Sequence, residues 1–288
     1  MKNILVPVDF SDTSATALRF GTYLAEVMDL DLRVVHVFDA NFSFAQAIST
    51  GALLAEKEKL KEELALFTKQ HTYPVLATFQ GNLETLPAIK RQVIEGFPAK
   101  VIRQLSEEGE TELVVMGGVG AGKNDTAPGL FGGVASGVVL HGSCPAILLP
   151  PGYGYPSVPS MAIAFGKAEE IQQMGGIVRK LIKTLRPEVR FVHVAGSEEA
   201  PEWENDDKFL DLALEPGFPS YTFSYDALPP GPVARRLLDY TKKKEIGMLV
   251  LEHGIRNLWD SLFTKSQVKP IMRSCEVPLL VVPALQKK

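Results

Sequence analysis

The chain carries one short stretch twice: Arg33-Val34-Val35-His36-Val37 returns as Arg190-Phe191-Val192-His193-Val194. A second stretch, Cys144-Pro145-Ala146-Ile147-Leu148-Leu149-Pro150, returns in the same order as Val277-Pro278-Leu279-Leu280-Val281-Val282-Pro283. Two matches in one order indicate a duplicated unit of about 140 residues, which is the size of a domain rather than of a short repeat. The sequence therefore predicts two domains of similar fold.

Short apolar runs alternate with amphipathic stretches in the first half of the chain. Continuous apolar runs of this kind suit strands that are buried on both faces of a parallel sheet. Between the first two runs, Ser14–Met28 has apolar residues at helical spacing, with Ser11, Asp12 and Ser14 as candidate helix caps. This alternation predicts an α/β domain. The predicted strands are Ile4–Val8, Leu32–Val37, Leu113–Met116 and Ala146–Leu149, and the further predicted helices are Ala52–Phe67, Ala99–Leu105 and Val134–Leu140.

The second half repeats the alternation after a stretch rich in proline and glycine at 151–160, which predicts a linker. We therefore expect one domain at 1–150 and another at 161–288. Residues 197–230 show no clear period, so the sequence predicts no element there. The strands predicted in the second half are Ala162–Phe165, Arg190–Val194, Met248–Leu251 and Leu279–Val282, and the helices are Val178–Leu185, Val233–Lys244 and Leu258–Ser274.

The composition limits the classes of protein to which the chain can belong. A length of 288 residues, with 45% hydrophobic and 22% charged residues, is that of an ordinary globular protein of two domains. The net charge of -4 gives no sign of nucleic-acid binding, and two cysteines make no disulfide framework. Met1–Asp9 does not resemble a signal peptide, and no apolar stretch approaches the roughly 18 residues that span a bilayer. We expect a cytoplasmic protein without membrane partners.

The main functional signal is a glycine-rich turn that only the first half contains. Leu113–Met116 runs directly into Gly117-Gly118-Val119-Gly120-Ala121-Gly122, and a helix follows near Gly132. In an open α/β sheet, glycines at a strand end let backbone N–H groups approach phosphate oxygens, and a helix N-terminus adds partial positive charge. The spacing matches neither the Walker A loop nor the G-x-G-x-x-G turn. The alternative interpretation is a plain flexible surface loop.

Together with four shorter motifs, this turn resembles the universal stress protein family in its tandem form. That family follows its fourth strand with Gly-x2-Gly-x9-Gly-(Ser/Thr), which Gly117, Gly120 and Gly132 approximate. The resemblance implies an α/β fold of two tandem doubly wound domains. Each domain would hold a five-stranded, mostly parallel sheet of strand order 3-2-1-4-5 with helices on both faces. The four shorter motifs are Val8-Asp9-Phe10-Ser11, His36-Val37, Gly96-Phe97-Pro98-Ala99 and Cys144-Pro145-Ala146-Ile147.

The resemblance implies a stress-response protein that binds an adenine nucleotide (ATP, ADP or AMP) in its first domain, with Mg²⁺ as the counter-ion. Asp9 is implied to contact the adenosine part, and the backbone of Val37 is implied to hold the adenine. Gly117 and Gly120 are implied to approach the ribose and the phosphates. The remaining implied residues hold the phosphates at a helix N-terminus and are Gly132, Gly133 and Val134.

The chain departs from the family pattern in the phosphate loop. Eleven residues instead of nine separate Gly120 from Gly132, and Gly133 and Ala135 stand where hydroxyl residues are expected. Each missing hydroxyl removes a hydrogen bond worth about 1–3 kcal/mol. We therefore expect weaker nucleotide binding than in members with the intact motif.

The second half departs further from the pattern. Gly166 or Lys167 stands in place of Asp9, and Glu252-His253-Gly254-Ile255-Arg256 replaces the glycine turn. A glutamate and a histidine prevent the close backbone approach that glycine allows. We expect the second domain to be a degenerate copy that does not bind nucleotide in the same way.

Other candidate groups have structural interpretations. His36 and His193 at equivalent strand ends could suggest a metal or catalytic site, but one structural hydrogen bond for each is the favoured interpretation. Nothing in the sequence around Cys144 argues for a reactive thiol. Because the sequence shows no catalytic or metal-ligating pattern, we predict no catalytic residue, no metal ligand and at most slow ATP hydrolysis.

The duplication also predicts how the protein assembles. Single-domain members of the resembled family dimerise through the last strand, so we expect Ala146–Leu149 and Leu279–Val282 to pair in an intramolecular pseudo-dimer. A homodimer of whole chains is a further expectation. Two alternative functions stay open. One is a scaffold or interaction module without nucleotide binding, and the other is an adenine-nucleotide-dependent enzyme such as an adenylating or electron-transfer protein.

Overall fold

The protein divides into two compact units, Met1–Pro156 and Ser157–Lys288, and each contains five parallel strands. The architecture comes from a computed structural model. The residues that it describes are 2–38, 50–79, 86–118, 132–154, 157–166, 176–195, 223–253 and 265–283.

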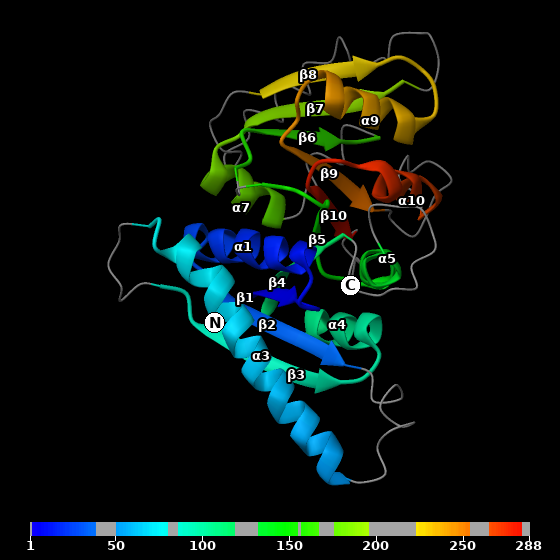
Figure 1. The fold of residues 1–288 in the computed structure, drawn as a ribbon. Coiled ribbons are helices and arrows are strands. Elements are labelled where there is room, and N and C mark those ends of the chain that lie inside the picture. The colour runs from blue at the N-terminus through cyan, green and yellow to red at the C-terminus, as the bar shows by residue number, and fades with distance from the viewer. Residues whose placement is uncertain are drawn as a thin grey trace. The chain divides into compact units, whose positions relative to one another are not determined.

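The first unit is built on a parallel sheet of five strands (Figure 1). Its strand order is β3-β2-β1-β4-β5, so the chain runs outward to one edge, returns to the centre and then runs to the other edge. This is the predicted order 3-2-1-4-5, and the α/β prediction is confirmed. The strands are β1 (Asn3–Pro7), β2 (Asp31–Phe38), β3 (Ile89–Glu95), β4 (Thr111–Gly117) and β5 (Ala146–Leu149).

Helices cover both faces of this sheet (Figure 1). The first helix, α1, packs against α3 and lies on β1 and β4, while α4 packs against α5. This arrangement brings the N-termini of α1 and α5 to the edge of the sheet at which the strands end. The helices are α1 (Asp12–Val27), α3 (Thr50–Leu76), α4 (Pro98–Glu107) and α5 (Gly133–His141).

Local sequence sets where α1 begins and how closely it lies on the sheet. Ser11 has an extended backbone, and its Oγ accepts a hydrogen bond from the amide of Ser14 at 3.2 Å, which caps the helix. The apolar face is fully buried, including Leu18. At Gly21 a Cβ would lie 2.7 Å from the side chain of Val6, so this glycine lets the helix approach β1.

Two elements of the first unit differ from the sequence prediction. The predicted helix Ala52–Phe67 is only part of α3, which continues to Leu76 because Val75 and Leu76 are buried and extend its apolar face. The sequence does not reveal β3, because this edge strand exposes Lys90 and Arg91 and lacks a continuous apolar run.

The second unit has the same strand order. Its parallel sheet is arranged β8-β7-β6-β9-β10, and α9 packs against α10. The strand β8 lies in the stretch 197–230, where the sequence predicts no element, because its side chains are mostly half-buried. Of the predicted helix Leu258–Ser274, the part before Lys265 lies outside the described residues. The elements are β6 (Ser160–Ala164), α7 (Gly176–Leu185), β7 (Glu188–Val194), β8 (Phe223–Leu228), α9 (Val233–Lys243), β9 (Met248–His253), α10 (Lys265–Ser274) and β10 (Leu279–Pro283).

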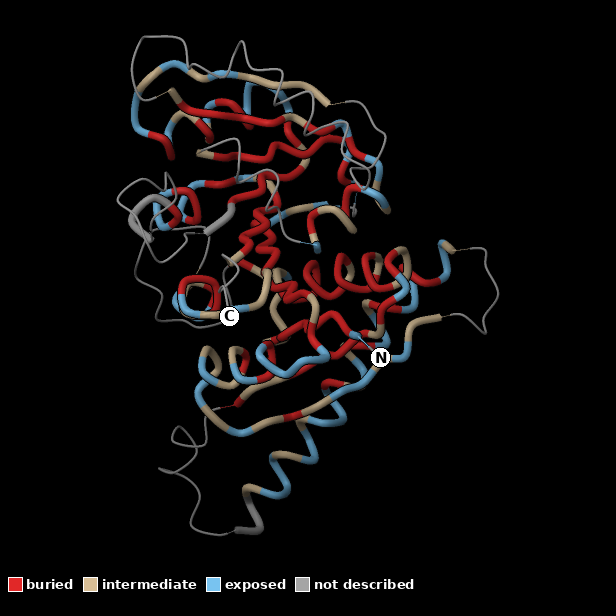
Figure 2. Tube along the Cα trace, turned by 180° about the vertical axis from the view of Figure 1, so that it is seen from behind, coloured by how far each residue is buried: buried red, intermediate tan, exposed pale blue. Residues whose placement is uncertain are grey.

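Each unit buries an apolar core around its first strand. Every residue of β1 and every residue of β6 is buried. Figure 2 shows this concentration of buried residues in the strands, whereas the described first half of α3, at 53–63, has no buried side chain. No helix in the described ranges is both long and apolar enough to cross a membrane.

Candidate functional site

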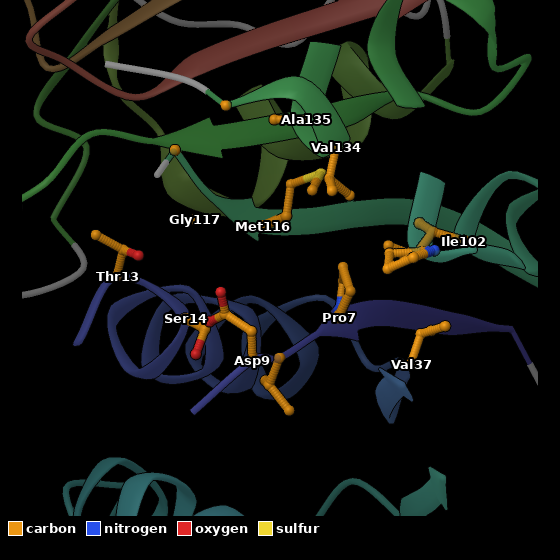
Figure 3. A pocket seen from close by; sticks show the side chains of 14 residues that line it. Pro7, Asp9, Thr13, Ser14, Val37, Ile102, Met116, Gly117, Val134 and Ala135 are labelled. Atoms are coloured by element: carbon orange, nitrogen blue, oxygen red, sulfur yellow. The ribbon is translucent and has the colours of Figure 1, made fainter. Parts of the chain in front are cut away.

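A pocket of about 290 Å³ opens in the first unit at the carboxyl ends of β1, β2 and β4 (Figure 3). The strand order reverses between β1 and β4, and ligands of open α/β sheets bind at such switch points. The strands supply its floor, while α1, α4 and α5 supply its walls. The lining residues are Pro7, Val8, Asp9, Thr13, Ser14, Val37, Pro98, Ile102, Met116, Gly117, Gly118, Gly132, Val134 and Ala135.

The pocket gathers most of the residues that the sequence analysis singled out. Five of the seven line it, although they are separated by up to 125 positions along the chain. Gly133 is the first residue of α5, next to the lining residues Gly132 and Val134. Gly120 lies outside the described residues. The five are Asp9, Val37, Gly117, Gly132 and Val134.

The lining residues that come from helices α1 and α4 were not predicted from the sequence. Thr13 and Ser14 lie in the first turn of α1, and Pro98 and Ile102 lie in α4. A signal for the first pair was present, because residues that follow a strand end and begin a helix are placed at the same edge of the sheet. A helix over Ala99–Leu105 was also expected, but its position over the sheet depends on packing rather than on local pattern.

The pocket has a polar side and an apolar side (Figure 3). The side-chain oxygens of Asp9, Thr13 and Ser14 gather on one side. The apolar side chains of Val37 and Ile102 lie on the other, and Pro7, Met116 and Val134 stand between the two sides. Ligand sites commonly combine an apolar body with a few placed polar groups.

Hydrogen bonds within the β1–α1 turn fix the polar side. One carboxylate oxygen of Asp9, Oδ1, accepts from both the amide and the hydroxyl of Ser11, at 3.2 and 2.5 Å. The hydroxyls of Ser11 and Thr13 lie 3.0 Å apart. The hydroxyl of Ser14 donates to the carbonyl oxygen of Ser11 at 2.9 Å. Each polar side chain on this side is therefore held in one orientation by its neighbours.

Glycine is required where β4 ends. A Cβ at Gly117 would lie 2.8 Å from the backbone carbon and oxygen of Thr13, so the strand end touches the main chain of α1. The next residue, Gly118, donates its amide to Leu149 at 2.8 Å and accepts from the amide of Gly132 at 2.6 Å. These bonds bring the start of α5 to the end of β4 and close that side of the pocket.

The N-terminus of α5 supplies hydrogen-bond donors. Gly132 is its N-cap, with an extended backbone and no side chain to cap the helix, and the first intrahelical bond joins the amide of Ser136 to Gly132. Helix geometry therefore leaves the amides of Gly133, Val134 and Ala135 without an intrahelical acceptor. Such amides, with the partial positive charge of the helix end, favour an anion.

An aromatic stack holds the turn that carries Asp9. Phe10 has φ of 64°, a left-handed backbone that costs a residue with a side chain of this kind about 1–3 kcal/mol. Its ring stacks on His36 at 4.4 Å between centroids and meets Phe67 edge-on at 5.4 Å. His36 places Nδ1 2.9 Å from the carbonyl oxygen of Val8. The prediction of a structural hydrogen bond for this histidine is confirmed.

The second unit repeats the histidine contact. His193 places Nδ1 3.2 Å from the carbonyl oxygen of Phe165, which follows β6 as Val8 follows β1. Its strand end differs, because Glu252 pairs with Val282 in the position where Gly117 pairs with Leu149. Glu252 thus occupies the register position of the glycine that α1 requires in the first unit.

The cysteines and acidic groups give no sign of further chemistry among the described residues. Burial, with a smaller effect of Glu112, raises the pKa of the Cys144 thiol to about 12, so this thiol stays protonated at neutral pH. Burial likewise raises the pKa of Cys275 to about 11. Within the described ranges, no three His, Cys, Asp or Glu side chains come together as a metal site.

Comparison with known proteins gives one consistent result. A family model, that of the universal stress protein family, matches residues 1–150, more than half of the chain. A universal stress protein of Methanocaldococcus jannaschii is 28% identical over 148 residues, which cover 51% of this chain and 81% of the relative.

Two solved structures resemble the whole chain in fold. That of a universal stress protein from Archaeoglobus fulgidus DSM 4304 covers 98% of both chains, with a TM-score of 0.73 and 16% identity. That of a functionally unknown protein from Pseudomonas aeruginosa PAO1 covers 99% of this chain and 93% of its own, with a TM-score of 0.58 and 11% identity. At these identities the similarity concerns the fold.

Proposed function

Because the chain belongs to the universal stress protein family, we propose that the pocket of its first unit binds an adenine nucleotide and that the protein acts in the stress response by binding and regulation. Catalysis has no part in this proposal beyond slow ATP hydrolysis. The second unit is proposed to be a degenerate copy of the first.

One observation carries the nucleotide proposal. Residues that the family resemblance assigned to the base, the ribose and the phosphates lie around a single pocket, although they come from three strands and the start of a helix. The pocket lies at the switch point of the sheet, where ligands of this architecture bind. A flexible surface loop alone would not bring Asp9 and Val37 to the same place as Gly132.

The pocket offers each part of a nucleotide a matching surface. The base would lie on the apolar side beside Val37 and Ile102, and the ribose beside Asp9. The phosphate would lie at the amides that begin α5, after Gly132. The volume of about 290 Å³ lies at the lower edge of the range of about 300–1,000 Å³ for small-molecule sites, so the phosphate end would reach toward solvent. Mg²⁺, as counter-ion, would add positive charge there.

The proposed degeneracy of the second unit rests on a shared frame and a changed strand end. The strand order and the contact of His193 with Phe165 repeat those of the first unit. Glu252 and His253 end β9 where two glycines end β4 and follow it. In the first unit the close approach of β4 to Thr13 requires glycine at position 117, and position 252 is not a glycine.

Isothermal titration of the full chain with ATP, ADP and AMP, with and without Mg²⁺, tests the proposal. Gly132→Val keeps an extended backbone that valine adopts readily and adds a side chain at the pocket, so it should abolish binding. Gly154→Val is the control, because a Cβ at Gly154 meets nothing within 4 Å and the residue is not part of the pocket. A dissociation constant of about 1 mM corresponds to a binding free energy of about 4 kcal/mol. If the unmodified protein binds no nucleotide at about millimolar concentration, the scaffold function replaces this proposal.

The intramolecular pseudo-dimer through Ala146–Leu149 and Leu279–Val282 stays a prediction, and so does a homodimer of whole chains. Separate expression of 1–156 and 157–288 tests the first. Each half should self-associate or precipitate, because its last strand would lack its partner. Two monomeric, stable halves would count against the pseudo-dimer, while sedimentation of the full chain tests the homodimer.

A further inference from the structure

The α1 side of the pocket presents hydrogen-bond acceptors, because the hydroxyl hydrogens there are used within the turn. Ser11 has a single hydroxyl hydrogen and donates it to Asp9 at 2.5 Å. Thr13 is therefore the donor in its 3.0 Å hydrogen bond with Ser11. Ser14 donates to the carbonyl oxygen of Ser11 at 2.9 Å. The carboxylate and hydroxyl lone pairs of these side chains therefore accept hydrogen bonds from hydroxyl or amino groups of a ligand.

The N-terminus of α1 already has an anion. Asp9 follows β1, and its Oδ1 accepts from the amide of Ser11, the N-cap of that helix. A carboxylate in this position is stabilised by the helix end. A ligand anion on the same side would meet a like charge, and phosphate oxygens, which accept hydrogen bonds, would meet other acceptors.

Donors lie on the opposite wall, at the start of α5. The amides of Gly133, Val134 and Ala135 have no intrahelical acceptor. The side chains of Val134 and Ala135 line the pocket and are apolar, so they bring no hydroxyl to the phosphate. A helix end carries about half an elementary charge. Among the residues that the structure describes, this wall therefore offers donors for a single anionic group.

Within the function proposed above, we infer that this pocket selects a nucleoside or a nucleoside monophosphate over the di- and triphosphate. The ribose hydroxyls donate to Asp9 and Ser14, the base lies on the apolar side, and one phosphate accepts from the amides of α5. Each further phosphate adds negative charge to a pocket that already holds a carboxylate.

Titration calorimetry of the full chain with adenosine, AMP, ADP and ATP, at constant ionic strength and without Mg²⁺, tests the inference. AMP should bind at least about tenfold more tightly than ATP, a difference of about 1.4 kcal/mol. Added Mg²⁺ should narrow the difference, because it neutralises the triphosphate. 2′,3′-Dideoxy-AMP, which lacks both ribose donors, should bind about tenfold more weakly than AMP.

Asp9→Asn separates this mechanism from a general loss of structure. The variant removes the carboxylate, so the preference for AMP over ATP and the discrimination against the dideoxy analogue should both fall toward one. Asp239→Asn is the control, because Asp239 is an exposed residue of α9 in the second unit and should leave both ratios unchanged. The thermal midpoint of each variant verifies that it folds.

Two results would overturn the inference while leaving nucleotide binding intact. One is ATP binding as tightly as AMP in the absence of Mg²⁺, and the other is equal binding of AMP and its dideoxy analogue. Failure of all four adenine ligands to bind would instead refute the proposed function, and the inference with it.

Discussion

The two units share a strand order and two side-chain contacts of their second strand, and they differ where their strands end. These shared features are called the frame below. In both units, a histidine of the second strand contacts the carbonyl oxygen of the residue that follows the first strand. His36 contacts Val8 in the first unit, and His193 contacts Phe165 in the second. Both also have an arginine at the same place in the second strand. Arg33 donates to Gln92 at 2.6 Å and Arg190 contacts Asp226 at 3.5 Å. Each of these arginine contacts joins two neighbouring strands, so they stabilise the sheet and not the pocket.

The difference lies at one register position near the end of the fourth strand of each unit. Gly117 permits contact with the main chain of α1, whereas Glu252 stands at the same register position in β9. The comparison teaches that the fold depends on apolar strands and a few strand-end bonds, which the described parts of both units share. The pocket of the first unit has Gly117 at the switch point, whereas the second unit has Glu252 at the same register position.

The largest expected effect comes from filling the space at Gly117. Gly117→Ala adds one Cβ that would lie 2.8 Å from backbone atoms of Thr13, which cannot rotate away. We expect a loss of about 1–3 kcal/mol in the free energy of unfolding, measured with urea, together with a loss of ligand binding. Gly109→Ala is the control, because a Cβ there meets nothing within 4 Å. Wild-type stability and binding in Gly117→Ala would refute the close contact as the reason for glycine.

The sequence predicted the buried strands because burial on both faces leaves a continuous apolar run, as in Ile4–Val8. It did not predict β3 and β8, because edge strands need no such run and carry polar residues such as Lys90 or Asp226. In α3 the sequence predicted a helix over Ala52–Phe67 alone, whereas the helix continues to Leu76. The buried contacts of the last turns decide that end instead.

The site was predictable to the extent that topology determines it. Asp9, Val37 and Gly117 follow or end strands, and the carboxyl ends of parallel strands meet at one edge of the sheet. Ile102 could not be placed in advance, because the position of α4 over the sheet depends on how it packs with α5. The left-handed backbone of Phe10 was also hidden, because it is maintained by a stack of rings from distant parts of the chain.

Replacing the two strand-end histidines tests whether the frame is equivalent in the two units. His36→Ala and His193→Ala each lose a hydrogen bond to a carbonyl oxygen and a ring contact, with Phe10 and Phe165 respectively. Each loss is expected to be about 1–3 kcal/mol in the free energy of unfolding. Phenylalanine at the same positions keeps the ring and should recover part of it. A large loss at one histidine alone would show that the frame is not shared.

Adding a hydroxyl at the start of α5 should increase the affinity of the pocket in the first unit for a phosphate group. At Gly133 a Cβ meets nothing within 4 Å, so Gly133→Ser is accommodated and offers the phosphate a donor at the helix N-terminus. Affinity for AMP should rise by up to about tenfold and that for adenosine should not change, as measured by calorimetry. Gly176→Ser, at the equally open start of α7, is the matched control. An equal gain for adenosine would mean that the hydroxyl does not contact phosphate.

The smallest expected effect is a pH dependence that belongs to the first unit. His71 of α3 accepts a hydrogen bond at Nδ1 from Arg19 of α1 at 3.2 Å, which requires a neutral ring. Burial, and then the charge of Arg19, lower the pKa of His71 below 6.5, while Asp12 acts in the opposite direction. Between that lowered pKa and 6.5 the unfolded chain binds more protons than the folded one. The contribution of His71 to stability is therefore complete above about pH 6.5 and is lost as the pH falls through the folded-state pKa.

Urea unfolding at about pH 7.5 and about pH 5.5 measures this effect, with the two values on either side of the ordinary histidine pKa. His71→Gln should reduce the loss of stability between the two pH values, because the titrating ring is gone. Lys59→Gln is the control, since Lys59 is an exposed residue of the same helix and should leave the loss unchanged. An identical loss of stability in the wild type and in His71→Gln would show that the contact between α1 and α3 does not depend on the charge of this ring. The pH dependence would then not be a feature that distinguishes the first unit from the second.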